Sequence, residues 1–479
     1  MAKMIIGGRK VDASDGATIA VTNPANGALV DTIPAATKAD VDAAVAAAAA
    51  GQKVWARAPI YERGVVLNRF VDLALAHKEE LARLLSKETG KPIVEARNEI
   101  DNIPTLFRGF VEKAKHFYGS VIPSGTEPGM EKTIQLTVNE PVGVVACVIP
   151  FNFPCDLFDQ KVAPALIMGN AAIVKPSTDN PLTLIRLCEL LIEAGVPDGA
   201  ISIVTGRGAT VGSWLCAHPG VDFISLTGST EVGIDTASAA AKNLTPSALE
   251  LGGNDAFIVL EDGNVDLAVE ETMFGRMYNT GQVCCASKRF IVHNARKAEF
   301  TAKLVARLGR LVQGDPQDEA TTIGCLISEK AAIAVEAQVN HTVTQGAKIV
   351  LGGKRRGAFY EPTVLTDVGA DTDVAKDLEI FGPVVPIIGF DSTEEAVRIA
   401  NGSIFGLSGC VFSANINEAM KVANALECGG AVINGCSFFR SCEMPFGGYK
   451  MSGIGNEGIM CSLEEVTRIK TIVLKNVLA

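Results

Sequence analysis

The chain has 479 residues, of which 48% are hydrophobic and 20% charged, and its formal net charge is -11. This length is too great for one compact core, so we expect two or three domains. No apolar run is long enough for a membrane span and no cluster of Lys and Arg suits a nucleic acid, so we expect neither partner. The first residues lack the apolar run of a signal peptide, which predicts a cytoplasmic protein.

Charge and cysteine usage set two further limits. An anionic substrate would be repelled by the overall field, so it would need a local cation near the chemistry. The 12 cysteines include no C-x-x-C pair and the five histidines are scattered. Because zinc sites need clustered ligands, we expect no metal site. We expect most of the thiols to be reduced and buried, although one or two could take part in the reaction.

The N-terminal region is predicted to form a short strand pair followed by helices. Asp40 is a plausible cap for the first helix, and Gly90-Lys91-Pro92 ends the third. The strands are expected at 4–6 and 18–21, and the helices at 40–52, 62–76 and 78–89.

From Pro141 onward, continuous apolar runs alternate with helical patterns. This alternation is typical of parallel sheets covered on both faces, so we expect two doubly wound α/β domains in series. In the first domain the strands are expected at 142–149, 171–174, 200–204 and 223–226, with helices at 182–194 and 209–217. In the second domain the strands are expected at 256–260, 289–292, 348–351, 383–390 and 431–434.

Two β-prone segments, 132–139 and 467–474, fit neither domain. A β-prone terminus is usually covered, so the two segments could form an arm that pairs with another subunit. A local hairpin explains the pattern equally well.

Cys284 lies in the segment Asn279-Thr-Gly-Gln-Val-Cys-Cys-Ala-Ser-Lys-Arg289, between a helical pattern at 267–278 and a strand. A cysteine at such a Gly-marked junction can be a nucleophile if nearby positive dipoles stabilise its thiolate. A Cys pair in a Cys-rich chain is otherwise a packing feature.

Three other segments favour chemistry over packing. Ile149-Pro-Phe-Asn152-Phe-Pro154 ends a strand and presents an amide donor suited to an oxyanion. Glu250, beside a Gly pair, suits general-base activation of water. Glu379, at the start of another strand, suits ribose hydroxyls.

In this order and spacing, these segments closely resemble the aldehyde dehydrogenase superfamily over essentially the whole chain. The resemblance is to its non-acylating members, including the lactaldehyde, succinate-semialdehyde and non-phosphorylating glyceraldehyde-phosphate dehydrogenase branches. The motifs are Pro-Phe-Asn152-Phe-Pro, Lys175-Pro-Ser, Thr227-Gly-Ser-Thr-Glu-Val-Gly233, Glu250-Leu-Gly-Gly, Gly281-Gln-Val-Cys284, Glu379-Ile-Phe-Gly-Pro and Pro445-Phe-Gly-Gly-Tyr-Lys.

The resemblance implies a role for each motif. Cys284 would be the nucleophile, its N–H and Asn152 the oxyanion hole, and Glu250 the base for the deacylating water. Glu379 would hold the nicotinamide ribose and Lys175 the adenosine ribose. The other implied cofactor contacts are Ile149, Pro150, Phe151, Ser177, Thr178, Gly208, Thr227, Gly228, Ser229, Val232, Leu251 and Phe381.

The resemblance also divides the chain by function. The ranges 1–118 and 142–251 would bind the dinucleotide, and 252–440 would carry the nucleophilic cysteine. The ranges 119–141 and 455–479 would form a small β oligomerisation arm, which implies a homodimer or homotetramer.

Thr178 bears on the choice of cofactor. In many NAD-using relatives a Glu stands at this position, where its charge would repel a 2′-phosphate. A hydroxyl can donate to that phosphate, so we expect NADP in preference to NAD. Arg207 could also reach the phosphate, and a neutral site that accepts both cofactors is the alternative.

For the substrate, the resemblance implies a tunnel wall that includes Asp156, Gln160, Cys285 and the segment 436–442. Arg440 in that segment could bind an anionic group of the substrate, or could be a solvated loop residue. We expect a polar or anionic aldehyde of two to four carbons, of the lactaldehyde, glycolaldehyde or succinate semialdehyde type. The alternatives are a CoA-acylating enzyme and a non-catalytic structural paralogue.

Overall fold

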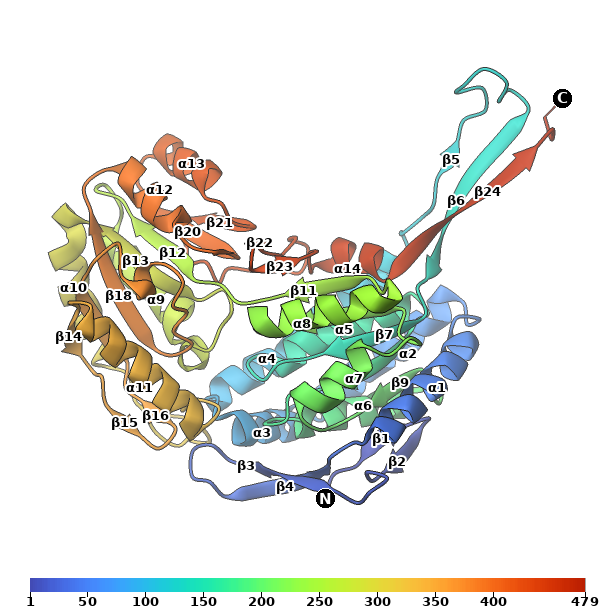
Figure 1. Cartoon of the computed structure of the whole chain (residues 1–479), viewed down its shortest axis with the longest axis horizontal. Helices are drawn as coiled ribbons and strands as arrows, with labels where there is room; N and C mark the ends of the chain where they lie inside the picture. Colours follow the sequence, from blue (N-terminus) through green and yellow to red (C-terminus); the bar gives the residue numbers. More distant parts are fainter. Residues whose placement is uncertain (479) are drawn as a thin grey trace.

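The computed structural model describes residues 1–478. Two α/β lobes lie side by side, and a narrow β arm projects from one of them (Figure 1). No helix within these residues is long and apolar enough to cross a membrane. No group of His, Cys, Asp and Glu in the same range could hold a metal ion.

The first lobe is built on an eight-stranded sheet whose central strands run parallel. Its order is β2 (Arg9–Val11), β1 (Met4–Ile6), β9 (Ile201–Ile203), β8 (Ala171–Lys175), β7 (Val144–Val148), β10 (Phe223–Thr227), β11 (Ser247–Glu250) and β23 (Gly453–Ile454). Helices α1 (Lys38–Trp55), α7 (Ser213–Cys216) and α8 (Thr230–Ala240) cover one face. The other face carries α2 (Ile60–Ala76), α3 (Lys78–Thr89), α4 (Ile93–Ala114), α5 (Pro154–Ile167) and α6 (Leu182–Ala194).

The second lobe repeats this architecture with a seven-stranded sheet. Its order is β14 (Lys348–Leu351), β17 (Thr363–Val368), β18 (Val384–Phe390), β13 (Ser287–His293), β12 (Asp255–Val259), β20 (Ser408–Phe412) and β21 (Gly430–Ile433). Only the edge pair β14–β17 is antiparallel. Helices α9 (Val265–Thr272) and α10 (Asn294–Leu308) pack on one face, and α11 (Glu329–Thr344), α12 (Thr393–Asn401) and α13 (Ile416–Ala425) on the other. The fold is therefore the predicted pair of doubly wound α/β units.

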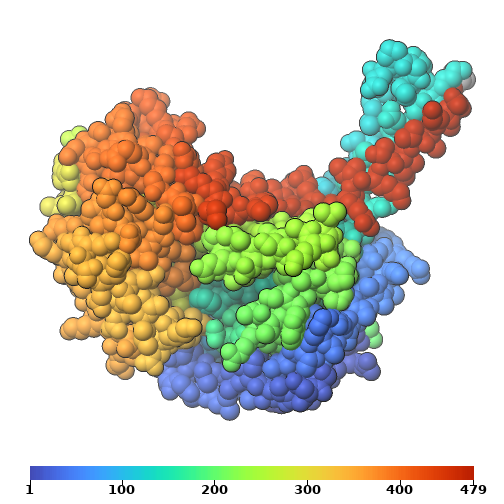
Figure 2. All heavy atoms as spheres, viewed as in Figure 1, coloured from blue at the N-terminus to red at the C-terminus, as the bar shows by residue number. Residues whose placement is uncertain are grey.

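The arm is a three-stranded sheet in which β24 (Thr467–Lys475) pairs antiparallel with β6 (Thr133–Pro141), and β6 with β5 (Val121–Ile122). It stands clear of both lobes (Figure 2). Its apolar side chains are exposed, and Ile469 is 74% accessible. The helix before it, α14 (Ile459–Glu465), packs against α4 and α5 instead. Of the range 455–479 expected to form the arm, only β24 belongs to this sheet.

Some local predictions differ from the structure. Strands 4–6 and 18–21 do not pair with each other. Strand β1 pairs with β2 and β9, and β3 (Thr18–Thr22) pairs with β4 (Leu29–Pro34). The cap of α1 is Thr37, with Asp40 three residues later completing a capping box. Gly90 does end α3, with a φ of 78° in the left-handed region.

Two short hairpins and several irregular turns complete the chain. The hairpins are β15 (Arg355–Arg356) with β16 (Phe359–Tyr360), and β19 (Phe405–Gly406) with β22 (Tyr449–Lys450). The helix expected at 209–217 is a π turn, Gly208–Gly212, that continues into α7. The helical pattern at 267–278 is α9 followed by a π turn, Met273–Met277, and a 3-10 turn, Tyr278–Gly281.

Candidate active site

Two large cavities meet at Cys284 and Asn152, which line both of them. One measures about 530 Å³ and is lined by α4, α5 and the loop 438–442. The other measures about 490 Å³ and is lined by the carboxyl ends of β7, β8 and β10 and by the start of α8. Ligands of open α/β sheets bind at the carboxyl ends of strands, so the second cavity suits a cofactor and the first a substrate.

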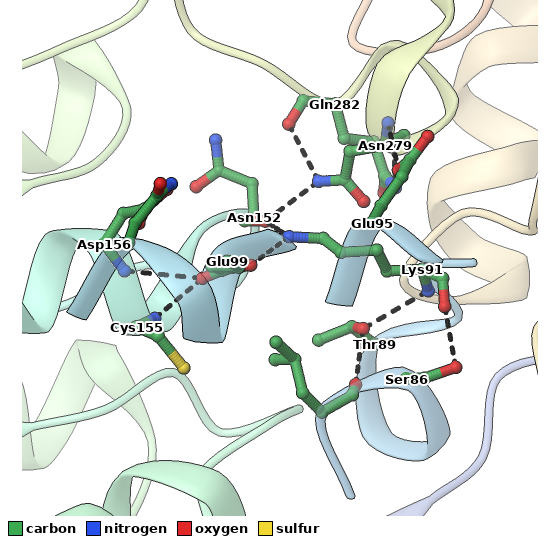
Figure 3. A network of polar contacts seen from close by, with 12 residues as sticks. Ser86, Thr89, Lys91, Glu95, Glu99, Asn152, Cys155, Asp156, Asn279 and Gln282 are labelled. Atoms are coloured by element: carbon green, nitrogen blue, oxygen red, sulfur yellow. Dashed lines mark hydrogen bonds and ion pairs between the residues drawn. The ribbon is translucent and has the colours of Figure 1, made fainter. Parts of the chain in front are cut away.

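Asn152 lies in the turn between β7 and α5, and its main chain is fixed from both sides. Its carbonyl oxygen accepts hydrogen bonds from Lys91 Nζ and from Asn279 Nδ2, each at 2.9 Å. The preceding carbonyl, of Phe151, accepts one from Asn180 Nδ2 at 2.8 Å. The side-chain amide of Asn152 points away from this network (Figure 3). The amide is therefore free to donate to a group at Cys284.

The segment before Cys284 has a strained backbone. Asn279, Thr280 and Gly281 have φ values of 49°, 55° and 77°, in the left-handed region that only Gly adopts without cost. Asn279 N donates to Glu95 Oε2 at 2.8 Å, and the side chain of Gln282 accepts from Ile327 N at 2.9 Å. These contacts hold the strained turn that directs Cys284 into both cavities.

Lys288 lies directly behind Cys284 and is almost fully buried. Its Nζ donates to the carbonyl oxygens of Cys284 at 2.5 Å and Gly253 at 2.7 Å, and lies 2.9 Å from Glu379 Oε1. Contact with the Cys285 thiol and burial raise the pKa of the Cys284 thiol well above its usual value, and the charge of Lys288 opposes this.

Glu250 ends β11 and is 5% exposed. Neither of its carboxylate oxygens has a hydrogen-bond partner among the described residues. Burial, followed by the negative charges of Cys284 and Glu457, raises the pKa of Glu250 well above its usual value. Desolvation makes a carboxylate a stronger proton acceptor than it is in water, which suits a general base.

A charged triad lies near Glu250, with Lys161 and Glu457 buried and Arg440 partly exposed. Lys161 Nζ donates to Glu457 Oε1 at 2.6 Å, and Arg440 Nη2 donates to Glu457 Oε2 at 2.9 Å. Burial would raise the pKa of Glu457, but the two cations outweigh it and lower this pKa to about 2. The Arg440 guanidinium also stacks 4.2 Å from the centre of the Phe446 ring.

The second cavity fits a dinucleotide. The start of α8 faces it, with Ser229 capping the helix, and helix N-termini favour phosphate. Lys175 on β8 is buried, which lowers its pKa to about 8, and Thr227 Oγ1 is buried without a partner among the described residues. The predicted cofactor residues that line the cavity are Ile149, Pro150, Phe151, Lys175, Ser177, Thr178, Gly208, Thr227, Gly228, Ser229, Val232, Glu379 and Phe381.

Two predicted contacts lie elsewhere. Leu251 is in the core beside Gly233, and Arg207 is exposed outside the cavity lining. Thr178 lines the cavity, but its hydroxyl already donates to Gly206 O at 3.0 Å. The neighbouring Asp179, which sequence reasoning missed, also lines it.

The first cavity has an apolar wall and a polar wall. The apolar wall includes Phe153, Phe274, Phe438 and Phe439. The polar wall carries the three predicted substrate residues, Gln160, Cys285 and Arg440, together with Asp156. Gln160 is 4% exposed, and its Oε1 has no partner among the described residues. Asp156 accepts from Asn102 Nδ2 at 3.2 Å.

Several residues of the site were not predicted. Lys288 is a buried charge beside Cys284, and Lys161 and Glu457 are buried charges beside Glu250. Lys91 and Glu99 hold the Asn152 turn. A lysine inside the apolar strand β13 is the one signal that the sequence offered, because a buried charge needs a partner. The others come from segments distant in sequence.

Comparison with known proteins agrees with this geometry. The model of the "Aldehyde dehydrogenase family" matches residues 11–472. Mitochondrial succinate-semialdehyde dehydrogenase of Arabidopsis thaliana is 39% identical over 98% of this chain and 88% of its own. The 3-sulfolactaldehyde dehydrogenase of Pseudomonas putida is 39% identical over 98% of this chain and 96% of its own. A crystal structure of betaine aldehyde dehydrogenase from Staphylococcus aureus in complex with NAD+ superposes with a TM-score of 0.95, at 36% identity, over 100% of this chain and 95% of that one.

The chain therefore belongs to the aldehyde dehydrogenase family. It is an NAD(P)-dependent aldehyde dehydrogenase, an oxidoreductase that uses a nicotinamide cofactor.

Proposed function

We propose that this enzyme oxidises a small polar or anionic aldehyde of two to four carbons to the carboxylic acid, through a thioester on Cys284. The observation that carries the proposal is that Cys284 and Asn152 line both cavities. A reacting carbon bound to Cys284 would therefore face the cofactor on one side and the substrate tunnel on the other.

The chemistry needs a covalent adduct, because hydride loss directly from an aldehyde carbon would leave an acylium ion. Addition of the Cys284 thiolate makes a tetrahedral thiohemiacetal whose oxyanion Asn152 and the Cys284 N–H can stabilise. The nicotinamide ring, when bound, supplies the hydride acceptor. Loss of hydride leaves a thioester, and Glu250 then takes the proton of the water that hydrolyses it.

For the substrate, we propose that Gln160 and Arg440 recognise its polar end. The buried Oε1 of Gln160 needs a donor such as a substrate hydroxyl, because an unpaired buried oxygen is costly. Arg440 supplies the local cation that a protein of net charge -11 requires for an anionic substrate. The names of the two relatives, succinate semialdehyde and 3-sulfolactaldehyde dehydrogenases, denote anionic aldehydes and favour the same class.

We propose NADP as the preferred cofactor and NAD as the second. The position of Thr178 carries no charge to repel a 2′-phosphate, and Lys175 lies on the same cavity. Asp179 on this cavity opposes the phosphate, so the preference should be modest. The ranges 1–118 and 142–251 would bind this cofactor, and 252–440 would carry the nucleophile.

Two alternatives are less well supported. A CoA-acylating enzyme would pass the acyl group to the thiol of CoA. The buried, unpartnered Glu250 would then have no water to activate. A non-catalytic paralogue would not need Cys284, Asn152 and Glu250 together. We also propose a cytoplasmic location. We propose a homodimer or homotetramer, because the arm formed by β5, β6 and β24 exposes β24 and the sheet edge at β21 is unpaired within residues 1–478.

A spectrophotometric panel tests this proposal. Glycolaldehyde, lactaldehyde, succinate semialdehyde, propanal and benzaldehyde are each assayed with NAD+ and with NADP+, with and without free CoA. The proposal expects the highest kcat/KM with a polar or anionic C2–C4 aldehyde and no need for CoA. A requirement for CoA, or a preference for benzaldehyde, would overturn it.

A further inference from the structure

We propose that Lys91 and Glu99 form a positioning pair, which fixes the Asn152 amide in the orientation that an oxyanion on Cys284 requires. This inference rests on the proposed role of Asn152 as an oxyanion donor. Neither residue lines the substrate or the cofactor cavity, so both act through Asn152.

Lys91 reaches Asn152 from the end of α3. It follows the left-handed Gly90, which turns the chain into the core, and it is 1% exposed. Its Nζ forms an ion pair with Glu99 and donates to the carbonyl oxygen of Asn152 at 2.9 Å. The same Nζ lies 4.2 Å from the centre of the Phe153 ring. The ammonium group therefore restrains the peptide bond between Asn152 and Phe153.

Glu99 restrains the other end of the same turn. From α4, its Oε2 accepts from Lys91, and its Oε1 accepts from Cys155 N at 2.8 Å, in the first turn of α5. A carboxylate is favourable at a helix N-terminus, where backbone N–H groups lack partners. One ion pair thus fixes both the Asn152 carbonyl and the start of the helix that follows it (Figure 3).

Asn279 connects this pair to the nucleophile segment. Its Nδ2 shares the Asn152 carbonyl with Lys91, and its carbonyl accepts from Gln282 Nε2 at 3.1 Å. The oxyanion donor and the Cys284 turn are therefore tied to one carbonyl oxygen. An oxyanion hole needs donors within hydrogen-bond distance of a negative charge that develops only during the reaction, so small rotations of Asn152 reduce the rate.

Stability alone does not explain the pair. Two charges buried from water cost several kcal/mol in desolvation, and an apolar pair of similar volume is often as stable. Beyond their mutual ion pair, Lys91 and Glu99 bond to the Asn152 turn and to the start of α5. Their burial is therefore better explained by a role in orienting Asn152.

A double-mutant cycle tests this inference. Asn152→Ala should lower the rate of the NAD(P)H burst by about 10²–10³-fold, as removal of one oxyanion donor does. Lys91→Met should lower it by about ten- to hundredfold, and Lys91→Arg should recover part of the loss. In the Asn152→Ala background, Lys91→Met should change the burst rate by no more than about twofold, because the group it orients is already gone. Cofactor affinity, measured by fluorescence quenching, should stay within about twofold in all variants.

A matched control separates positioning from general structure. Glu88 is also a buried carboxylate that accepts from the first N–H groups of a helix, those of Leu182 and Thr183 at the start of α6. Glu99→Gln should slow the burst, whereas Glu88→Gln should lower the melting temperature and leave the burst rate of the folded enzyme unchanged. If Lys91→Met does not fold, Asn279→Ala, which removes the second donor to the same carbonyl, replaces it in the cycle.

The outcomes are distinguishable. If Asn152→Ala keeps the wild-type burst, the proposed role of Asn152 fails. If Asn152→Ala is slow but Lys91→Met lowers the rate by the same factor in both backgrounds, the positioning inference fails and the proposed function stands. Equal burst losses in Glu99→Gln and Glu88→Gln would also overturn the inference.

Discussion

Arg440 Nη2 donates to Glu457 Oε2 at 2.9 Å on the wall of the cavity that contains Cys284. Glu457 is bound by Lys161 on its other oxygen, so two cations share one buried carboxylate. Of these three groups Arg440 alone lines the cavity, and Asp156 is the acidic residue on the same lining.

We expect Cys284→Ser to abolish aldehyde oxidation and leave cofactor binding unchanged, because a serine hydroxyl has no accessible anion at neutral pH. Cys285→Ser is the matched control and should retain turnover, since Cys285 is buried beside the nucleophile. Steady-state rates and cofactor titrations measure both. A dead Cys285→Ser beside an active Cys284→Ser would move the nucleophile by one residue.

Glu250→Gln should release about one equivalent of NAD(P)H and then stall, because the thioester forms and its hydrolysis lacks a base. Stopped-flow absorbance separates the burst from the steady state. Loss of the burst to the same degree as turnover would contradict this division of roles.

Thr178→Glu should shift the ratio of kcat/KM for NADP to that for NAD toward NAD, because the new charge repels a 2′-phosphate and pairs with ribose hydroxyls. Thr178→Gln, of similar size but neutral, should change the ratio much less. A wild-type enzyme that already prefers NAD strongly would make the NADP proposal wrong.

The structure also shows which features the sequence could predict. The apolar runs in the sequence predicted the two sheets. The motifs predicted that Asn152 and Cys284 lie together, and in the structure both line the same cavity. The side chain of Leu251 lies in the core and outside the cavity lining, because neighbouring residues in a motif can face opposite sides of the backbone. The buried pair Lys161–Glu457 could not be predicted, because only the fold brings α5 and the C-terminal segment together. Lys91 and Glu99 are neighbours in sequence, and it is their contact with the Asn152 turn that only the fold creates.

Asp156 should make substrate preference depend on pH. Burial, followed by the negative charge of Glu99, raises the pKa of Asp156 to about 7. Below that pH the side chain is neutral, and above it the carboxylate repels an anionic aldehyde. The ratio of kcat/KM for succinate semialdehyde to that for propanal should therefore fall as pH rises from 6 to 8, and Asp156→Asn should remove this fall.

The ratio cancels the titration of Cys284 and Glu250, which both substrates share. Asp101→Asn is the charge-matched control, because Asp101 is exposed on α4 and lies outside the cavity lining. The idea fails if the ratio is constant with pH in the wild type, or if Asp101→Asn changes it as much as Asp156→Asn.

Arg440→Ala should raise KM for succinate semialdehyde far more than for propanal. The protein as a whole repels anions, so the local guanidinium should supply most of what holds the charged end of the substrate. Charge-assisted hydrogen bonds contribute roughly 1.5–3 kcal/mol, which corresponds to about a ten- to hundredfold loss in kcat/KM for the anionic aldehyde. The neutral aldehyde should lose no more than about twofold by the same reasoning.

The contact with Glu457 makes a second variant necessary, because Arg440→Ala also leaves that carboxylate with one cation fewer. Arg440→Lys keeps the charge, so it should recover most of the affinity for the anionic aldehyde if charge attraction is the cause. Equal losses for both aldehydes in Arg440→Ala would instead assign Arg440 to the support of Glu457, and a wild type inactive on anionic aldehydes would remove the premise.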